Sequence, residues 1–187
     1  KKIEEGEGEE ARIAEYLSRE IARAHLATMK RLDVTYDVLP CESSILHLKF
    51  WEKAFQLLQE KQAITLAREG PNKGCWIMPL SHRTEKEKVI VRSDGTVTYV
   101  GKDIAYQLWK LGLLGLDFYY EPFLKENGHT IWISTHQPTP YQVHFGGGSK
   151  VYNVIDTRQS YLQDVVVQGL RRLGYSREAD KSIHFSY

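Results

Sequence analysis

Tyr99 and Asp103 carry a phenol and a carboxylate on either side of a predicted strand-to-helix junction, and Gln159 carries an amide beside a second such junction. In open α/β sheets, ligands bind at the carboxyl ends of strands, where helix amino-termini and loop side chains converge. Each residue also has a simpler interpretation. Asp103 can cap a helix, Tyr99 can be a half-buried strand residue, and Gln159 can belong to a first helical turn.

The segment around Tyr99 and Asp103 has the pattern of a hairpin that leads into a helix. β-Branched residues alternate on both sides of Asp94-Gly95, and a two-residue turn at that point needs the positive φ that glycine allows. We expect Gly101 to break the second strand and Asp103 to begin the helix. The apolar face of this helix would then comprise Ile104, Leu108 and Leu111.

The rest of the chain divides near residue 80. We expect residues before this point to be helical, with one apolar stripe formed by Ile13, Leu17, Ile21 and Ala24 and another by Leu48, Trp51, Phe55 and Leu58. Residues 42–44 would start the second helix. For the second part, the pattern predicts strands over 75–80, 88–100, 130–134, 141–145 and 151–156, and helices over 103–114 and 159–173. A buried strand followed by a helix, twice over, indicates a parallel sheet.

Composition excludes several classes of protein. The chain has 187 residues, 42% of them hydrophobic, and no apolar run approaches the roughly 20 residues that span a bilayer. Cys41 and Cys75 lack metal-ligand spacing, so we interpret them as buried reduced thiols of a cytosolic protein, and we predict no metal site. The net charge of +1 argues against a role for this chain as the main nucleic-acid-binding surface. Arg171 and Arg172 are more simply a solvated pair near a helix end.

Two further segments invite a specific interpretation. The run Gly146-Gly-Gly-Ser-Lys150 lacks the spacing of a phosphate-binding loop and leads into a strand, so we predict a flexible turn. The acidic stretch over residues 4–10 is predicted to be a frayed, solvated terminus.

Three ordered segments resemble arginyl-tRNA synthetases, a family of class I aminoacyl-tRNA synthetases. The first is Ala27-Thr-Met-Lys-Arg-Leu-Asp-Val-Thr-Tyr-Asp-Val-Leu-Pro-Cys-Glu-Ser43, the second is Ser93-Asp-Gly-Thr-Val-Thr-Tyr-Val-Gly-Lys-Asp-Ile-Ala105, and the third runs from Val151-Tyr-Asn-Val-Ile-Asp-Thr-Arg-Gln-Ser160 to Leu170-Arg-Arg-Leu-Gly-Tyr175. The His-Ile-Gly-His-like and Lys-Met-Ser-Lys-Ser-like segments of that family do not occur. The resemblance therefore implies a middle portion of a larger enzyme, inactive by itself.

The resemblance implies an α/β fold, namely the second half of a Rossmann-like parallel sheet, preceded by a helical subdomain. Residues 1–80 would form a helical connective segment and residues 81–187 the Rossmann-like catalytic half, with an insertion at about 117–150. If the other half covers the sheet in the larger enzyme, this chain should expose an apolar face.

The resemblance also implies a function. The parent enzyme would be a cytoplasmic arginine-tRNA ligase that activates L-arginine with ATP, assisted by Mg²⁺, and transfers it to tRNA(Arg). Tyr99, Asp103 and Gln159 match positions that contact the arginine side chain, whose guanidinium needs a carboxylate partner. Asp156 and Arg158 would approach the adenosine of ATP, although Asp156 can equally cap the following helix. No catalytic residue is assigned. The alternative is a non-catalytic synthetase-like module that binds arginine or a protein partner.

Overall fold

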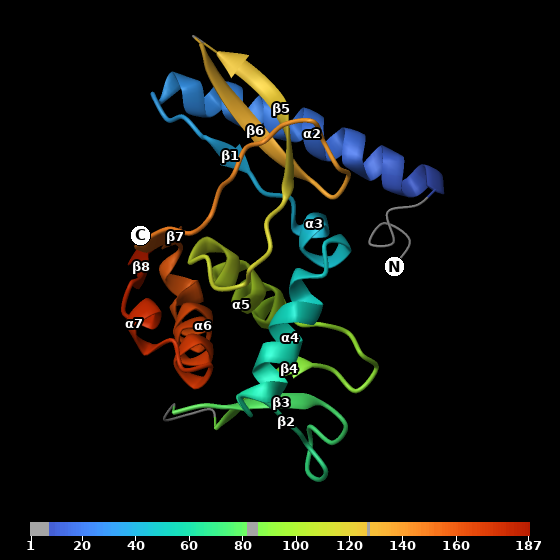
Figure 1. Ribbon diagram of the computed structural model, residues 1–187, viewed down its shortest axis with the longest axis vertical. Coiled ribbons are helices and arrows are strands. Elements are labelled where there is room, and N and C mark those ends of the chain that lie inside the picture. Colours follow the sequence, from blue (N-terminus) through green and yellow to red (C-terminus); the bar gives the residue numbers. More distant parts are fainter. Residues whose placement is uncertain (1–7, 82–85, 127) are drawn as a thin grey trace. The chain divides into compact units, whose positions relative to one another are not determined.

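A computed structural model describes residues 8–81, 86–126 and 128–187 (Figure 1). Most of the acidic stretch predicted to fray lies outside the described residues. The chain forms a mixed α/β structure with two compact units. Unit 1 comprises residues 1–44 and 118–143, and unit 2 comprises residues 45–117 and 144–187. The boundary expected near residue 80 falls inside unit 2, and much of the segment expected to be an insertion lies in unit 1.

Unit 1 pairs one long helix with a three-stranded sheet. Helix α2 (Gly8–Arg31) accompanies strands β1 (Val38–Leu39), β5 (Tyr119–Glu126) and β6 (His129–Thr135), in the order β1-β6-β5. Strand β1 is parallel to β6 and β5 is antiparallel to it. The core of this unit consists of Leu26, Phe123, Ile131 and Ile133.

Helix α2 confirms the predicted first helix, but most of its apolar stripe is exposed. Ala11 and Leu26 are buried, whereas the side chains of Ile13, Leu17 and Ile21 are 51%, 51% and 54% exposed. The helix directs a neighbouring face to the sheet, because Leu26 packs with Phe123 and the strand residues around it. An apolar stripe at helical spacing indicates a helix but does not settle which side is covered.

In unit 2, helix α5 (Tyr99–Lys110) is in contact with both α4 (Phe50–Glu60) and α6 (Ser160–Arg172), as Figure 1 shows. The predicted apolar face of α5 is confirmed, since Ile104, Leu108 and Leu111 are all buried. The helix expected from residue 42 is instead two helices, α3 (Glu42–His47) and α4, because Lys49 adopts a left-handed conformation between them.

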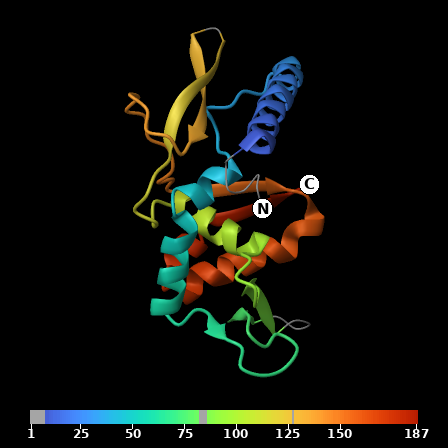
Figure 2. The same cartoon turned by 90° about the vertical axis from the view of Figure 1, so that its right-hand side faces the viewer.

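Two small sheets complete unit 2. Strands β2 (Thr65–Leu66), β3 (Trp76–Pro79) and β4 (Glu87–Val91) form an antiparallel sheet. Strands β7 (Val151–Ile155) and β8 (Ser182–Ser186) form a parallel pair that lies along α5 and α6 in Figure 2, with the short elements η1 (Thr157–Gln159) and α7 (Ser176–Ala179) between them in sequence. Residues 141–145 were predicted as a strand, which is wrong: they form no regular strand.

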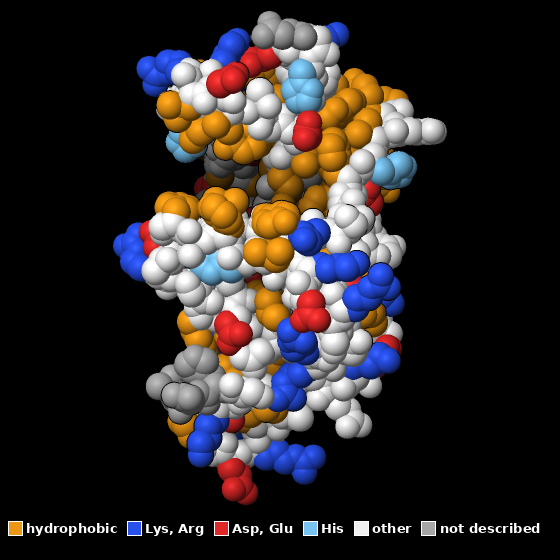
Figure 3. All heavy atoms as spheres, turned by 90° about the vertical axis from the view of Figure 1, so that its left-hand side faces the viewer, with side chains coloured by type: hydrophobic (Ala, Val, Ile, Leu, Met, Phe, Trp, Pro, Cys, Tyr) orange, Lys and Arg blue, Asp and Glu red, His pale blue; other side chains and the backbone are white. Residues whose placement is uncertain are grey.

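The outer face of the β7–β8 pair is apolar and exposed, as expected for a sheet that lacks cover. Strand register places Val154 beside Phe185, and both side chains are about three-fifths exposed, at 62% and 61%. Tyr152 and Tyr187 are exposed as well. Exposed hydrophobic side chains are visible among Lys and Arg side chains on the face drawn in Figure 3.

The glycine run is a turn, but one that is attached to a helix. Gly146 and Gly147 have φ angles of 80° and 64°, and Gly148 N donates a hydrogen bond to the carbonyl oxygen of Lys110 at 2.7 Å. Helix C-termini leave carbonyl groups without intrahelical partners, and this turn satisfies one of them. The run therefore caps the end of α5.

Candidate functional site at the amino-terminus of helix α5

The turn between β4 and α5 differs in type from the predicted two-residue turn. Gly95 N donates to the carbonyl oxygen of Arg92 at 2.9 Å, and Arg92 N donates to that of Thr96 at 2.9 Å. Gly95 has a φ of 85°, and Thr96 N donates to Asp94 Oδ1 at 2.9 Å. These contacts define a three-residue loop closed by a left-handed glycine. Only an isolated bridge between Val91 and Val97 follows, so the second strand is very short.

Helix α5 begins at Tyr99, four residues before the predicted start at Asp103. Thr98 is the N-cap residue, and its Oγ1 lies within hydrogen-bond distance of the carbonyl oxygens of Val89 (3.1 Å) and Ile90 (3.0 Å). These contacts attach the start of α5 to strand β4. Asp103 therefore lies in the second turn of the helix and does not cap it, which corrects the predicted capping role. Gly101, predicted to break a strand, is a buried residue of the first turn.

Tyr99 and Asp103 lie four residues apart in α5, and residues at this spacing share one helix face. The Tyr99 side chain is 76% exposed, with Lys102 Nζ 5.9 Å from its ring centroid. Asp103 is half-buried. Its carboxylate acts electrostatically on Lys110, whose pKa is lowered by burial and partly restored by that charge. The shared face thus presents a phenol and a carboxylate.

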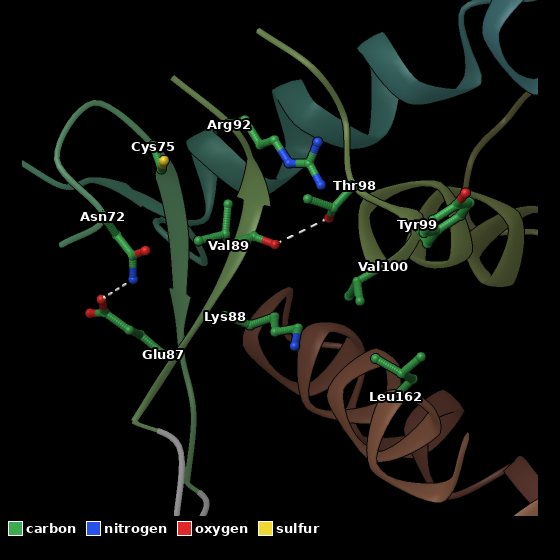
Figure 4. Close-up of a pocket in the computed structure, with 10 residues that line it drawn as sticks. All are labelled: Asn72, Cys75, Glu87, Lys88, Val89, Arg92, Thr98, Tyr99, Val100 and Leu162. Carbon is green, nitrogen blue, oxygen red and sulfur yellow. Dashed lines mark hydrogen bonds between the residues drawn. The ribbon is translucent and has the colours of Figure 1, made fainter. Parts of the chain in front are cut away.

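Gln159 occupies the other predicted junction, which follows β7. It is the exposed last residue of η1 and the N-cap residue of α6. Leu162, in the first turn of α6, lines the same pocket as Tyr99 (Figure 4). The structure therefore brings both junctions to one region of unit 2, although neither Asp103 nor Gln159 is among the described residues that line this pocket.

Asp156 and Arg158 are paired with each other. Asp156 accepts from the Arg158 backbone N–H at 2.8 Å and from the guanidinium at 3.0 Å and 2.8 Å. Hydrogen bonds from Arg158 lower the pKa of the Asp156 carboxyl. The structure thus has Asp156 in the capping role that the sequence left open, at the start of η1.

The pocket beside Tyr99 has a volume of about 510 Å³. Its charged lining comprises Lys88, Arg92 and Glu87, and Glu87 accepts a hydrogen bond from Asn72 Nδ2 at 2.8 Å. Two cationic side chains and one carboxylate favour an anionic group over a guanidinium. The full lining is Asn72, Cys75, Glu87, Lys88, Val89, Arg92, Thr98, Tyr99, Val100 and Leu162.

Sequence reasoning missed most of these pocket residues. The available signal was the placement of charges at both ends of an otherwise apolar strand, from Glu87-Lys88 to Arg92. Asn72 had no such signal, because it lies in a turn whose approach to Glu87 depends on the pairing of β3 with β4.

The described residues contain no group of three or more His, Cys, Asp or Glu side chains arranged to hold a metal ion. Cys41 and Cys75 are both free thiols, and both are half-buried, less covered than the sequence suggested. No helix in the described ranges is long and apolar enough to cross a membrane.

Comparison with known proteins places the relatives of this chain among the aminoacyl-tRNA synthetases. More specifically, they are arginine-tRNA ligases. The chain is 34% identical over 191 residues to that of Thermococcus sibiricus and 37% identical over 191 residues to that of Pyrococcus furiosus, in both cases over its full length. The ligase of Deinococcus radiodurans is 37% identical over 178 residues, which is 91% of this chain. No protein-family profile matches the chain.

A solved structure agrees with these sequence matches. The chain is similar to Thermus thermophilus arginyl-tRNA synthetase, with a TM-score of 0.78 and 32% sequence identity over 91% of this chain. In each comparison the chain spans about 30% of the relative's own length: 30% in Thermococcus sibiricus, 29% in Pyrococcus furiosus and 30% in the solved structure. The resemblance to arginyl-tRNA synthetases is confirmed, and the chain matches a segment of these enzymes.

Proposed function

We propose that this chain is part of an arginine-tRNA ligase that activates L-arginine with ATP and transfers it to tRNA(Arg), and that it supplies the pocket for the arginine side chain. The observation that carries this proposal is the shared face of Tyr99 and Asp103 at the start of α5, in a chain whose relatives are arginine-tRNA ligases over its full length. Such a protein would act in the cytoplasm.

Asp103 is the residue that we assign to the guanidinium. A carboxylate pairs with two of the five N–H donors of that group, and half-burial strengthens the pairing relative to bulk water. Tyr99 supplies a flat ring or a phenolic oxygen at the entrance, and the Gln159 amide oxygen can accept a further N–H. Lysine offers fewer donors and citrulline lacks the charge, so this set of groups discriminates against both.

The chemistry is adenylate formation followed by acyl transfer. The arginine carboxylate attacks the α-phosphate of ATP and displaces pyrophosphate, which gives arginyl-adenylate. The terminal ribose hydroxyl of the tRNA then attacks the carbonyl carbon of this adenylate and displaces AMP. Catalysis of this kind rests on positioning and charge stabilisation. Asp156 and Arg158 are our candidates for contact with the adenosine of ATP. Mg²⁺ would assist the phosphates, and no described residue is assigned to it.

We also propose that the part of unit 2 after residue 80, residues 81–117 and 144–187, belongs to the second half of a Rossmann-like catalytic domain. Its parallel β7–β8 pair lies along α5 and α6, and the exposed apolar face of the pair suits further cover in a longer chain. The helical segment up to about residue 80 would precede this half, and residues of about 117–150 would be inserted into it. The interruption of unit 2 between residues 117 and 144 supports the insertion.

Calorimetry of arginine binding tests the pocket. We expect arginine to bind to the chain in preference to lysine and citrulline, and Asp103→Ala to weaken binding by about 2 kcal/mol, or about thirtyfold, because it removes a charged partner. Asp164→Asn, which alters an exposed carboxylate of α6, is the matched control and should bind like the unaltered chain. Equal affinity for arginine and citrulline would refute the assignment of Asp103.

A ligase assay of the longer protein separates the two functional hypotheses. Attachment of arginine to tRNA that is lost with Asp103→Ala supports the ligase. Selective arginine binding without attachment would instead favour the non-catalytic module.

A further inference from the structure

A chain of hydrogen bonds that passes through two buried amides joins α5 to both strands of the β7–β8 pair. Lys110 Nζ donates to Asn153 Oδ1 at 2.8 Å, Asn153 Nδ2 donates to Gln107 Oε1 at 3.3 Å, and Gln107 Nε2 donates to Ser182 Oγ at 2.8 Å. Gln107 and Asn153 are only 3% and 7% exposed. Every nitrogen and oxygen of the two side-chain amides therefore has a partner, which is the condition for a buried polar network to be favourable.

Lys110 sets the direction of this network. An ammonium group can donate hydrogen bonds but cannot accept them, so the amide of Asn153 must turn its oxygen towards Lys110. Its nitrogen must then face Gln107, which turns the Gln107 oxygen towards Asn153 and the Gln107 nitrogen towards Ser182. A side-chain amide can adopt two orientations that exchange its oxygen and nitrogen, and the single cation selects one orientation for each of the two buried amides.

The cation is itself held in place. Lys110 Nζ lies 4.3 Å from the ring centroid of Tyr106, a distance that suits attraction between a cation and an aromatic face. The Tyr106 ring in turn stacks on Trp109, with centroids 5.2 Å apart and an interplanar angle of 7°. The ammonium group of Lys110 is thus held by the Tyr106 ring on α5 and by the Asn153 amide on β7.

The network lies between the elements that carry the proposed arginine pocket. Gln107 lies one helical turn after Asp103, and Lys110 lies two turns after Asp103. The three residues therefore lie along one side of α5. Asn153 is in the middle of β7, and that strand leads directly to Gln159. The hydrogen bonds from Asn153 to Gln107 and Lys110 therefore fix strand β7 relative to helix α5. Gln159 follows β7, and Tyr99 and Asp103 belong to α5.

We propose that Lys110, Gln107 and Asn153 are positioning residues that set the distance between Asp103 and Gln159 in the arginine pocket. They act through the register of α5 on β7 and do not contact the substrate. This inference rests on the proposed function of the same site. A site that must match a planar guanidinium needs its groups held closely, and buried hydrogen bonds behind the site provide that support.

The test uses Lys110→Met, which keeps most of the apolar stem and removes the donor, and Asn153→Leu, which removes the central amide. Gln163→Leu is the matched control, because Gln163 is a buried amide of α6 outside the network. Ser182→Ala, which removes only the last acceptor, replaces any variant that fails to fold. For each variant we would measure the thermal midpoint, the backbone amide signals of Tyr99, Asp103 and Gln159 by nuclear magnetic resonance, and arginine affinity by calorimetry.

We expect Asn153→Leu, which leaves every charge in place, to shift the amide signals of Asp103 and Gln159 and to weaken arginine binding about tenfold, because the two side chains are then no longer held in one geometry. Lys110→Met should shift the same two signals, while its arginine affinity also reflects the loss of the Lys110 charge that acts on Asp103. Gln163→Leu should leave both readouts unchanged even where it lowers the midpoint equally. Network variants that lower the midpoint but leave the signals of Asp103 and Gln159 in place would overturn the proposal.

The two proposals fail in distinguishable ways. Absence of arginine binding in the unaltered chain would contradict the proposed pocket. The amide signals still decide the positioning role in that case, because they report on the geometry of Asp103 and Gln159 without a ligand. Shifted signals support the network as a positioning device, and unshifted signals overturn it.

Discussion

Gly101 of α5 lies directly against the indole ring of Trp51 in α4. A Cβ atom on Gly101 would lie 3.0 Å from Cζ3 of Trp51 and 2.9 Å from Cγ1 of Val97, closer than side chains normally approach. Trp51 is buried, with 8% of its surface exposed, and its ring lies 5.4 Å from that of Phe55. The first turn of α5 can therefore pack closely on α4 only because residue 101 has no side chain.

Gly101→Ala should destabilise the fold. Alanine favours a helix over glycine by about 1 kcal/mol, but overpacking against a rigid buried ring costs about 1–3 kcal/mol. We expect a net loss of about 1 kcal/mol in the free energy of unfolding, measured by urea denaturation. The amide signals of Trp51 and Tyr99 should shift as α5 moves away from α4.

Gly169→Ala is the control for this prediction, because Gly169 is also a buried glycine inside a helix. Its added Cβ would meet Cδ1 of Ile104 at 3.1 Å, and the end of a flexible side chain can move aside more readily than an indole ring. We expect its stability to be unchanged or slightly higher. An equal loss in both variants would show that the ring contact at Gly101 is not the cause.

The Gly101 contact also explains where prediction from the sequence stopped. The apolar positions of α5 followed from spacing alone, since Ile104, Leu108 and Leu111 are buried as expected. The start of the helix did not follow, because the local pattern indicates a break at Gly101 and a helix cap at Asp103. Whether a glycine ends an element or permits close packing depends on its neighbour in space, here Trp51, which is 50 residues away in the chain.

The thiol of Cys41 should react slowly with alkylating agents. Burial raises the pKa of this thiol, and the thiolate is the reactive form. Because the pKa of this thiol is higher in the folded chain than in the unfolded chain, the thiol stabilises the fold at pH values below the ordinary thiol pKa. This contribution is lost as the pH rises through the raised pKa of the folded chain. In a Cys75→Ser variant, which isolates Cys41, the iodoacetamide reaction at pH 8 should be slower than in the urea-unfolded chain. Equal rates would contradict this prediction.

Tyr106 should remain un-ionised well above the ordinary range of tyrosine. Burial raises the pKa of its phenol to about 12. The folded chain then keeps a proton that the unfolded chain has lost, so stability from this group is complete below about pH 10 and falls as the pH rises from about 10 to about 12. Spectrophotometric titration at alkaline pH follows the ionisation of the tyrosines. In Tyr106→Phe, the ionisation that occurs at the highest pH should be absent. A titration curve that is the same in both proteins would show that Tyr106 is not the shielded phenol.

The candidate site was predictable to different degrees at its two junctions. The motif around Tyr99 and Asp103 located the right helix, because polar residues at a strand-to-helix junction are a local pattern. The buried amides Gln107 and Asn153 had no local pattern to reveal them. Their roles depend on the pairing of β7 with β8 and on the packing of α5 beside both, which bring Ser182 to Gln107 from 75 positions along the chain.

The glycine turn that caps α5 should tolerate substitution unequally. Gly146 has a φ of 80°, and a Cβ there would lie 2.8 Å from the carbonyl oxygen of Trp109 and 3.0 Å from its ring. Gly147 has a φ of 64° but no atom within 4 Å of its would-be Cβ. Alanine at either position incurs backbone strain of about 1 kcal/mol, and only alanine at 146 adds a clash.

We therefore expect Gly146→Ala to lower the free energy of unfolding by about 2–3 kcal/mol and Gly147→Ala by about 1 kcal/mol, measured by urea denaturation. Gly146→Ala should also disturb Lys110, because the same turn places Gly148 N on the Lys110 carbonyl oxygen at 2.7 Å. The Lys110 amide signal should shift in Gly146→Ala and stay in place in Gly147→Ala. Equal destabilisation by both variants would mean that left-handed backbone strain, and not the close approach to Trp109, makes glycine necessary at 146.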